Sequence, residues 1–195
     1  IAAETVLSDV DGLAGRLVIR GRQLDDLAGH VGFEDLAALL LDGFFQDLPV
    51  GRALALRLGK ARGEVFESLV SAGLPAAHLP ATDALRAALA QLEDGDDIGL
   101  ALRLIAAPAV FTPAIIRAKR GEAPIAPDPQ AGHAADMLRM LHGTLPRLEA
   151  AAALDAYLVT VSDHGLNAST FAARVVASTH AGLTSAVLAA LGALK

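Results

Sequence analysis

Apolar residues recur every three or four positions along most of the chain, which is the repeat of one face of an α-helix. The clearest stripe contains Phe33, Leu36, Ala37, Leu40 and Leu41. Comparable stripes cover residues 24–28, 54–61, 65–70, 85–92, 98–107, 111–116, 132–143 and 148–159. Gly59 interrupts the stripe over residues 54–61. The stripes over residues 54–61 and 65–70 are therefore predicted as two separate segments. The pattern favours a series of amphipathic helices joined by short turns.

Prolines and capping residues set the predicted helix boundaries. Pro108 lacks a backbone N–H and restricts the residue before it, so it should end or kink the helix that precedes it. Residues 121–129 are rich in proline and are predicted to form an extended connector. Thr82 or Asp83 is the expected N-cap of the predicted helix that contains the stripe over residues 85–92.

The first twenty residues carry a different pattern. Residues 5–10 and 16–20 are predicted as two short strands, and Asp11-Gly12 between them is a turn signal. An irregular N-terminal arm is the alternative. An isolated hairpin is marginally stable, so this one should lie on the helices. The predicted fold is all-α with a small N-terminal β-hairpin, in two parts: an arm over residues 1–22 and a helical region over residues 23–195.

Composition supports a helical fold and excludes several classes of protein. Hydrophobic residues make up 53% of the 195 residues but aromatic residues only 4%, so the core must be built from Ala, Leu and Val. A net charge of −6 argues against nonspecific nucleic-acid binding. The most apolar run, residues 99–116, is interrupted by Arg103, Pro108 and Pro113, which argues against a membrane span. The absence of Cys and of a signal peptide pattern favours the cytoplasm.

Three groups of polar residues are candidate sites. A basic group on one predicted helix consists of Arg52, Arg57, Lys60 and Arg62. It is predicted to be a solvated face, with contact to an anionic ligand as the alternative. The acidic loop over residues 93–97 lacks the spacing of a calcium loop and is predicted to be solvated. His133 and His142 lack a local carboxylate partner and are predicted to cap helix ends, so no metal site is expected.

The stretch over residues 162–170 holds the densest group of polar side chains. Gly165 is expected to break the preceding helix, and Asn167 or Ser169 to N-cap the following one. A helix N-terminus favours an anion, so His164 should lie at a helix–helix corner beside a carboxylate-binding site. A capped corner with a surface histidine is the alternative.

The amino-acid sequence around this stretch, and at the two ends of the chain, resembles the citrate synthase family, which includes citrate and 2-methylcitrate synthases. The matching segments run in order along essentially the whole chain. They are residues 3–21 (AETVLSDVDGLAGRLVIRG), 157–164, 167–179 and 186–195 (AVLAALGALK). In the family, Gly-Pro-Leu-His-Gly follows the last of these, and its His is catalytic. We therefore expect the main catalytic His and Asp to lie beyond Lys195, and the 195-residue chain alone to be inactive.

The resemblance implies a fold, a reaction and an assembly. Members are all-α homodimers, and this chain resembles the first part of their large domain, without the smaller domain. The implied reaction condenses acetyl-CoA, or another short acyl-CoA, with oxaloacetate to give citrate and CoA, as in the tricarboxylic acid cycle. No permanently bound cofactor is implied, since acetyl-CoA is a co-substrate. The helices flanking Asp163-His164 would form the dimer interface.

The resemblance also implies roles for four residues. His164 matches the position that hydrogen-bonds oxaloacetate, and Asn167 and Ser169 match the turn that lines the same site. Asp163 would hold His164 in one tautomer, with a simple end-of-helix carboxylate as the alternative. The competing hypothesis for the whole chain is a non-catalytic helical dimerisation or binding module, such as half of a split or degenerate citrate synthase. The residues present do not distinguish acetyl-CoA from propionyl-CoA.

Overall fold

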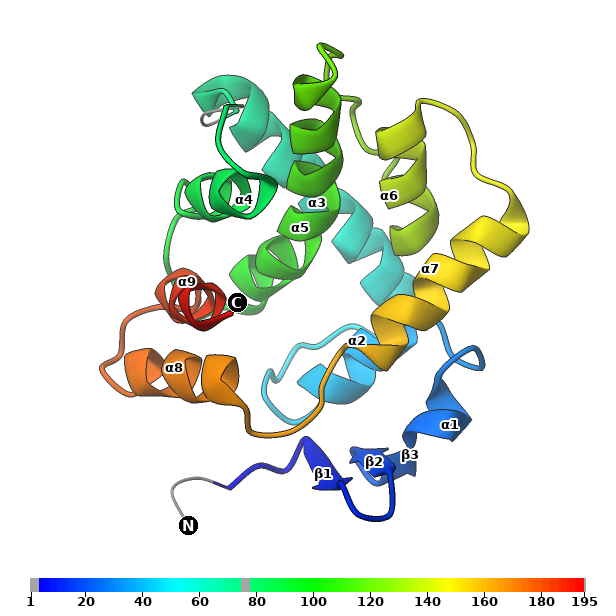
Figure 1. Cartoon of the computed structure of the whole chain (residues 1–195), viewed down its shortest axis with the longest axis vertical. Helices are drawn as coiled ribbons and strands as arrows, with labels where there is room; N and C mark the ends of the chain where they lie inside the picture. The colour runs from blue at the N-terminus through cyan, green and yellow to red at the C-terminus, as the bar shows by residue number, and fades with distance from the viewer. Residues whose placement is uncertain (1–3, 75–77, 195) are drawn as a thin grey trace.

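Two long helices form the centre of the molecule, seen in a computed structural model that describes residues 4–74 and 78–194 (Figure 1). In Figure 1, α5 crosses in front of α3, and the other helices surround this pair. The bounds of the helices in the core are α2 (Phe33–Leu41), α3 (Arg52–Ala72), α4 (Ala81–Leu89), α5 (Ile98–Lys119), α6 (His133–His142) and α9 (Leu183–Ala193). Buried Leu, Ala and Val side chains dominate their contact surfaces. The predicted all-α class is therefore confirmed.

The N-terminal residues form a small antiparallel sheet, as the sequence predicted. Its strands are β1 (Ser8–Asp11), β2 (Arg16–Ile19) and β3 (Arg22–Gln23), in that order. Short helix α1 (Leu24–Leu27) follows directly, and the sheet lies beside α1 and α2 in Figure 1. Ile19 is fully buried and packs in a second core with Leu27, Leu36 and Val159, the last from α7 (Leu148–Thr160). The alternative of an irregular arm is wrong, because this apolar contact anchors the hairpin on the helices.

Two helices run through residues that were predicted to interrupt them. α3 continues through Gly59, where a Cβ atom would lie 2.0 Å from the carbonyl oxygen of Pro129. The glycine costs helix propensity, but it permits the extended connector to pack directly on the helix backbone. α5 continues through Pro108 and Pro113 to Lys119, so of the two predicted effects of Pro108, an end or a kink, the end is wrong. Burial of α5 on several sides outweighs the hydrogen bonds that the prolines remove.

The acidic loop over residues 93–97 is not merely solvated, because its carboxylates bind the first turns of α5 and α9. Asp97 N-caps α5 by accepting a hydrogen bond from Leu100 N at 2.7 Å. Asp94 accepts from the backbone N–H of Thr184 at 2.9 Å and from the backbone and hydroxyl of Ser185, in the first turn of α9. The Ser185 hydroxyl is the main cause that lowers the pKa of Asp94. The loop therefore fixes the start of α9 against the start of α5.

The predicted N-cap of α4 is wrong. The helix begins at Ala81 with Pro80 as its N-cap, and no side chain caps it. Thr82 and Asp83 lie inside the first turn, where Asp83 pairs with Arg86 at 2.9 Å. Pro80 provides a fixed φ for helix entry but no side-chain acceptor, so local propensity alone misplaced the boundary.

The predicted basic face is also wrong at one position. Arg62 is completely buried, and its Nε lies 2.8 Å from Oδ2 of Asp136, whose side chain is equally buried. Its Nη2 donates to the carbonyl oxygens of Asp128 at 3.1 Å and Ala131 at 2.7 Å. Three members of the predicted face are exposed: Arg52, Arg57 and Lys60. Arg62 thus ties α3 to the connector and to α6.

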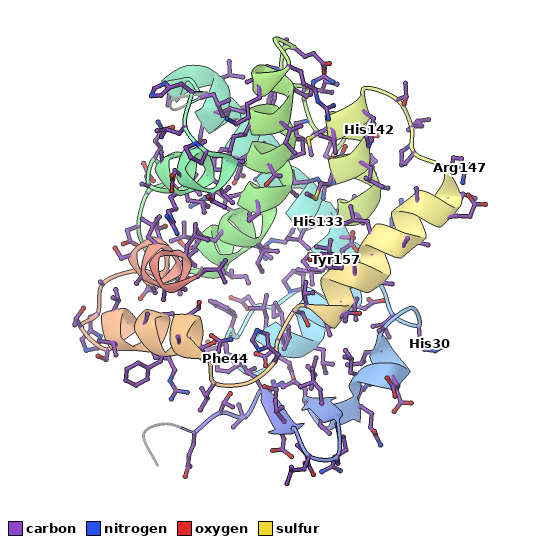
Figure 2. The ribbon with its side chains drawn as sticks, in the orientation of Figure 1. His30, Phe44, His133, His142, Arg147 and Tyr157 are labelled. Carbon is purple, nitrogen blue, oxygen red and sulfur yellow. The ribbon has the colours of Figure 1, made fainter. Side chains whose placement is uncertain are left out.

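His133 is a core residue and does not cap α6. Its ring is buried and stacks on Phe33 at a centroid distance of 4.6 Å, and Figure 2 shows it at the end of α6 nearest α7. Its backbone N–H donates to Glu34 Oε1 at 2.7 Å. His142 lies exposed at the other end of the helix, before Gly143 in the left-handed conformation. Among the described residues, no group of three His, Cys, Asp or Glu side chains could hold a metal ion.

α5 is the one helix in the described ranges that is long and apolar enough to cross a membrane by length and composition. However, 67% of its most apolar window is buried inside the fold. A core helix passes the same test, and the packing of α5 against α3, α4 and α6 accounts for its composition.

The close approach of Pro129 to Gly59 predicts that one added methyl group has a large effect on the free energy of unfolding. Gly59→Ala should lower the free energy of unfolding by about 1–3 kcal/mol, because the new Cβ collides with the backbone of Pro129. Gly63 lies one turn further along α3, and a Cβ there meets nothing within 4 Å. Gly63→Ala should therefore raise stability by about 0.5–1 kcal/mol. Urea unfolding of both variants tests this pair, and equal effects of the two substitutions would contradict it.

The burial of His133 predicts a loss of stability in acid. Burial first, and then the positive charge of Arg62, lower the pKa of His133 from 6.5 to about 3. Between these two values the unfolded chain binds more protons than the folded chain, so stability falls as the pH falls through this window. His133→Gln should remove up to about 1.4 kcal/mol per pH unit from that slope. His142→Gln should keep the slope of the unmutated chain, and an unchanged slope in His133→Gln would refute the assignment.

Candidate functional site

The polar stretch forms the turn between α7 and α8 (Ala168–Ala177). α7 ends at Thr160, before the position predicted from Gly165. Gly165 instead lies within the turn, with a φ of +90° that glycine adopts readily. The residues between Thr160 and Gly165, which were predicted to end the helix, therefore belong to the turn. The turn is longer than the sequence indicated.

The N-terminus of α8 is capped by Asn167, as predicted. Its Oδ1 accepts a hydrogen bond from the backbone N–H of Thr170 at 2.9 Å. Ser169, the alternative cap, lies half-buried in the first turn of the helix. The first N–H groups of a helix have no partner within it and carry partial positive charge, so this end of α8 favours an anion.

The turn brings His164 to the capping residue. The ring of His164 is exposed, and its Nε2 lies 3.2 Å from Nδ2 of Asn167. This is the one hydrogen bond of that ring within the described part of the chain. An imidazole therefore lies next to the positive end of a helix, an arrangement that suits a ligand with anionic oxygens.

Asp163 connects the turn to the N-terminal sheet. Its Oδ1 accepts hydrogen bonds from the hydroxyl of Ser8 in β1 and from the backbone N–H of Gly165 at 2.9 Å. The side chain of Val10 packs over Gly165, so close that a Cβ there would lie 3.0 Å from it. The role predicted for Asp163 toward His164 stays a prediction, since its described contacts are with Ser8 and Gly165. Ser8 was missed because it lies 155 residues away in sequence.

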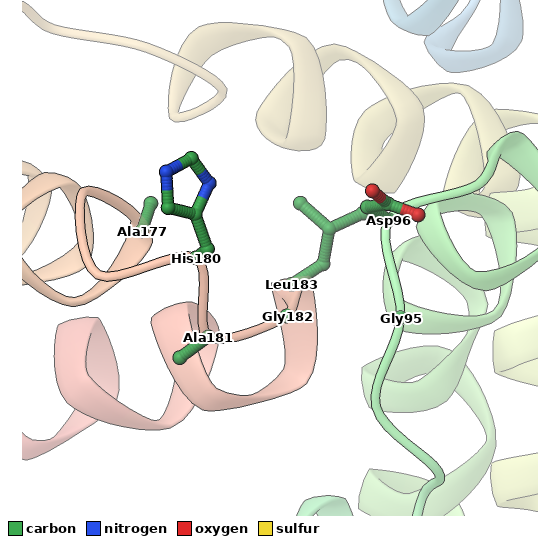
Figure 3. Close-up of a pocket in the computed structure, with 7 residues that line it drawn as sticks. All are labelled: Gly95, Asp96, Ala177, His180, Ala181, Gly182 and Leu183. Carbon is green, nitrogen blue, oxygen red and sulfur yellow. The ribbon is translucent and has the colours of Figure 1, made fainter.

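A surface pocket lies at the opposite end of α8 from His164 (Figure 3). It measures about 430 Å³ and lies between the acidic loop and the turn that joins α8 to α9. His180 and Asp96 face it from its two sides, with Leu183 between them in Figure 3. None of the residues predicted to bind substrate lines this pocket. The candidate site is thus an exposed turn and not an enclosed cavity.

Comparison with known proteins gives a consistent result along the whole chain. The profile of the citrate synthase C-terminal domain matches residues 1–195. The chain is 36% identical over 203 residues to 2-methylcitrate synthase of Mycobacterium tuberculosis, covering 98% of this chain and 51% of that protein. It is 35% identical over 215 residues to citrate synthase of Haloferax volcanii, covering 100% and 55% respectively. The chain spans about half the length of these curated relatives.

Solved structures share its fold. Citrate synthase from Thermotoga maritima superposes with a TM-score of 0.78 at 27% identity, over 99% of this chain and 53% of that one. Citrate synthase from Thermoplasma acidophilum, solved as a ternary complex with carboxymethyl coenzyme A and oxaloacetate, gives a TM-score of 0.79 at 25% identity, with the same coverage. From the profile match and these relatives, the chain belongs to the citrate synthase family.

Proposed function

We propose that this chain provides part of the active site of a citrate-synthase-type acyltransferase. The reaction condenses acetyl-CoA, or another short acyl-CoA, with oxaloacetate and releases CoA. The observation that carries the proposal is the match of the family profile to all 195 residues. The relatives include both citrate and 2-methylcitrate synthases, which supports a short acyl-CoA as the co-substrate without selecting its length. No resident cofactor is proposed, and the tricarboxylic acid cycle in the cytoplasm is the proposed setting.

The chemistry defines what the turn would contribute. A base must remove a weakly acidic proton beside the thioester, and hydrogen-bond donors must stabilise the charge that develops on oxygen. We assign His164 to binding of oxaloacetate, with Asn167 and Ser169 lining the same site. The N-terminus of α8 supports this assignment, because its free N–H groups favour a carboxylate. In the family pattern, the base and the further histidine follow the residues that this chain matches.

We also propose that the protein is a homodimer that associates through α7 and α8. No described residue of α8 is fully buried, although the helix is mostly apolar. Phe171 and Val175 are each about half exposed, and Tyr157 and Val161 are exposed on and just after α7. Exposed apolar residues on both helices favour an interface, and a twofold-symmetric copy is the commonest partner.

The role of His164 can be tested by kinetics of the full-length protein. His164→Ala should raise the barrier for oxaloacetate by about 2–4 kcal/mol, the effect of losing a hydrogen bond to a charged group. This corresponds to a loss of about 30- to 900-fold in kcat/KM with oxaloacetate varied. His142→Ala removes an exposed histidine of α6 and should leave kcat/KM unchanged. Unchanged kinetics in His164→Ala would sink the assignment and favour a capped corner with a surface histidine.

The proposed interface can be tested by light scattering. Val175→Glu places a charge on the exposed apolar side of α8 and should convert the dimer to a monomer at tens of micromolar. Val70→Glu is the matched control, since Val70 is 64% exposed on α3, away from the proposed interface. A monomeric unmutated chain, or a dimer that survives Val175→Glu, would contradict the proposal.

A further inference from the structure

The amide group of Asn167 has one orientation that satisfies both of its neighbours. Its Oδ1 accepts from the backbone N–H of Thr170 at 2.9 Å, and this bond caps α8. A flipped amide would point its NH₂ group at that N–H, placing two donors face to face and removing the cap. Because a backbone N–H can only donate, it fixes which end of the amide is oxygen. Nδ2 is therefore the end that lies 3.2 Å from His164.

A fixed amide donor determines the state of the histidine ring. In a neutral imidazole, one nitrogen carries the proton and the other is an acceptor. Nε2 of His164 faces the NH₂ group of Asn167, so Nε2 is the acceptor and the proton lies on Nδ1. We propose that Asn167 is a positioning residue that holds His164 in the Nδ1–H tautomer, so that Nδ1–H is the donor that His164 offers to a ligand.

Asn167 thus takes the role of holding His164 in one tautomer, which the resemblance implied for Asp163. The carboxylate of Asp163 bonds to the hydroxyl of Ser8 and to the backbone N–H of Gly165, and these contacts hold the turn and not the ring. The cap of α8 and the tautomer of His164 thus depend on one side chain. Loss of that side chain affects both.

The tautomer also narrows the class of ligand. Nδ1–H can only donate, and the neighbouring N–H groups at the start of α8 are donors as well. A site made of donors selects acceptor oxygens, such as those of carboxylate and keto groups, and disfavours ligand amines. The identification of that ligand with oxaloacetate rests on the proposed function, whereas the tautomer does not.

Nitrogen NMR of the ¹⁵N-labelled 195-residue chain tests the tautomer directly. At about pH 8.5, where an ordinary histidine is neutral, long-range proton–nitrogen correlations show which ring nitrogen is protonated. The His164 signals are those missing in His164→Gln. We expect the Nδ1–H form in about fivefold excess, the ratio that one ordinary hydrogen bond produces. Predominance of the Nε2–H form, or an equal mixture, would overturn the inference.

Asn167→Asp provides a matched variant. Asp is as good an N-cap as Asn, so α8 should remain intact by circular dichroism. Its second carboxylate oxygen would face Nε2 as an acceptor, so Nε2 should become protonated. An unprotonated Nε2 in a folded Asn167→Asp chain would overturn the inference, and the unmutated chain alone decides it if the variant does not fold.

Adding oxaloacetate to the ¹⁵N-labelled full-length protein separates the two claims. A change in the Nδ1 signal on titration supports the donor role of Nδ1–H and the proposed function together. With the Nδ1–H form established, signals unaffected by oxaloacetate would contradict the proposed ligand while the tautomer assignment stands.

Discussion

The buried ion pair between Arg62 and Asp136 is the contact on which the packing of α6 and the connector against α3 depends. Neither side chain is exposed, so the pair must recover the cost of removing two charges from water. It does so through further bonds: Asp136 accepts from Arg139 and from the backbone of Asp128, and Arg62 donates to two connector carbonyls. These bonds fix the connector over residues 121–131 against α3. The absence of a side chain at Gly59 allows that approach.

The same contact positions the candidate site indirectly. α6 begins where Asp136 is held, α7 packs against α6, and α7 leads into the turn that carries His164. From the other side, the N-terminal segment holds the turn through Ser8 and Asp163, and Arg174 of α8 donates to the carbonyl oxygen of Glu4 at 2.6 Å. The turn is exposed to solvent, yet both of its ends are tied to packed elements. Such support is what a binding turn needs in order to keep its geometry.

Much of the fold was predictable from local pattern, and the exceptions share a cause. Helical periodicity located most of the helices, although not α9, and the N-cap at Asn167 was predictable because an acceptor three residues before Thr170 is a local signal. The burial of Arg62 was not, because its partner Asp136 lies far away in sequence and the charge looks like any surface arginine. The continuity of α5 through Pro108 likewise reflects tertiary burial, which overrides local propensity.

The candidate site divides in the same way. Its position at the start of α8 followed from the sequence, but the partners of its side chains did not. The role predicted for Asp163 toward His164 stays a prediction, and the described contacts of its carboxylate are with Ser8 and Gly165. Asn167 lies three residues after His164, beyond the turn at Gly165, and its amide contacts the ring. The side-chain contacts of the turn depend on its three-dimensional geometry, which the local sequence pattern does not specify.

The central claim is that the turn around His164 binds the dicarboxylate of a citrate-synthase-type reaction. A crystal structure of the full-length protein with oxaloacetate tests it most directly. We expect a ligand oxygen within hydrogen-bonding distance of Nδ1 of His164, with Nε2 still bonded to Asn167. An ordered oxaloacetate bound elsewhere, with no contact to His164, would contradict it.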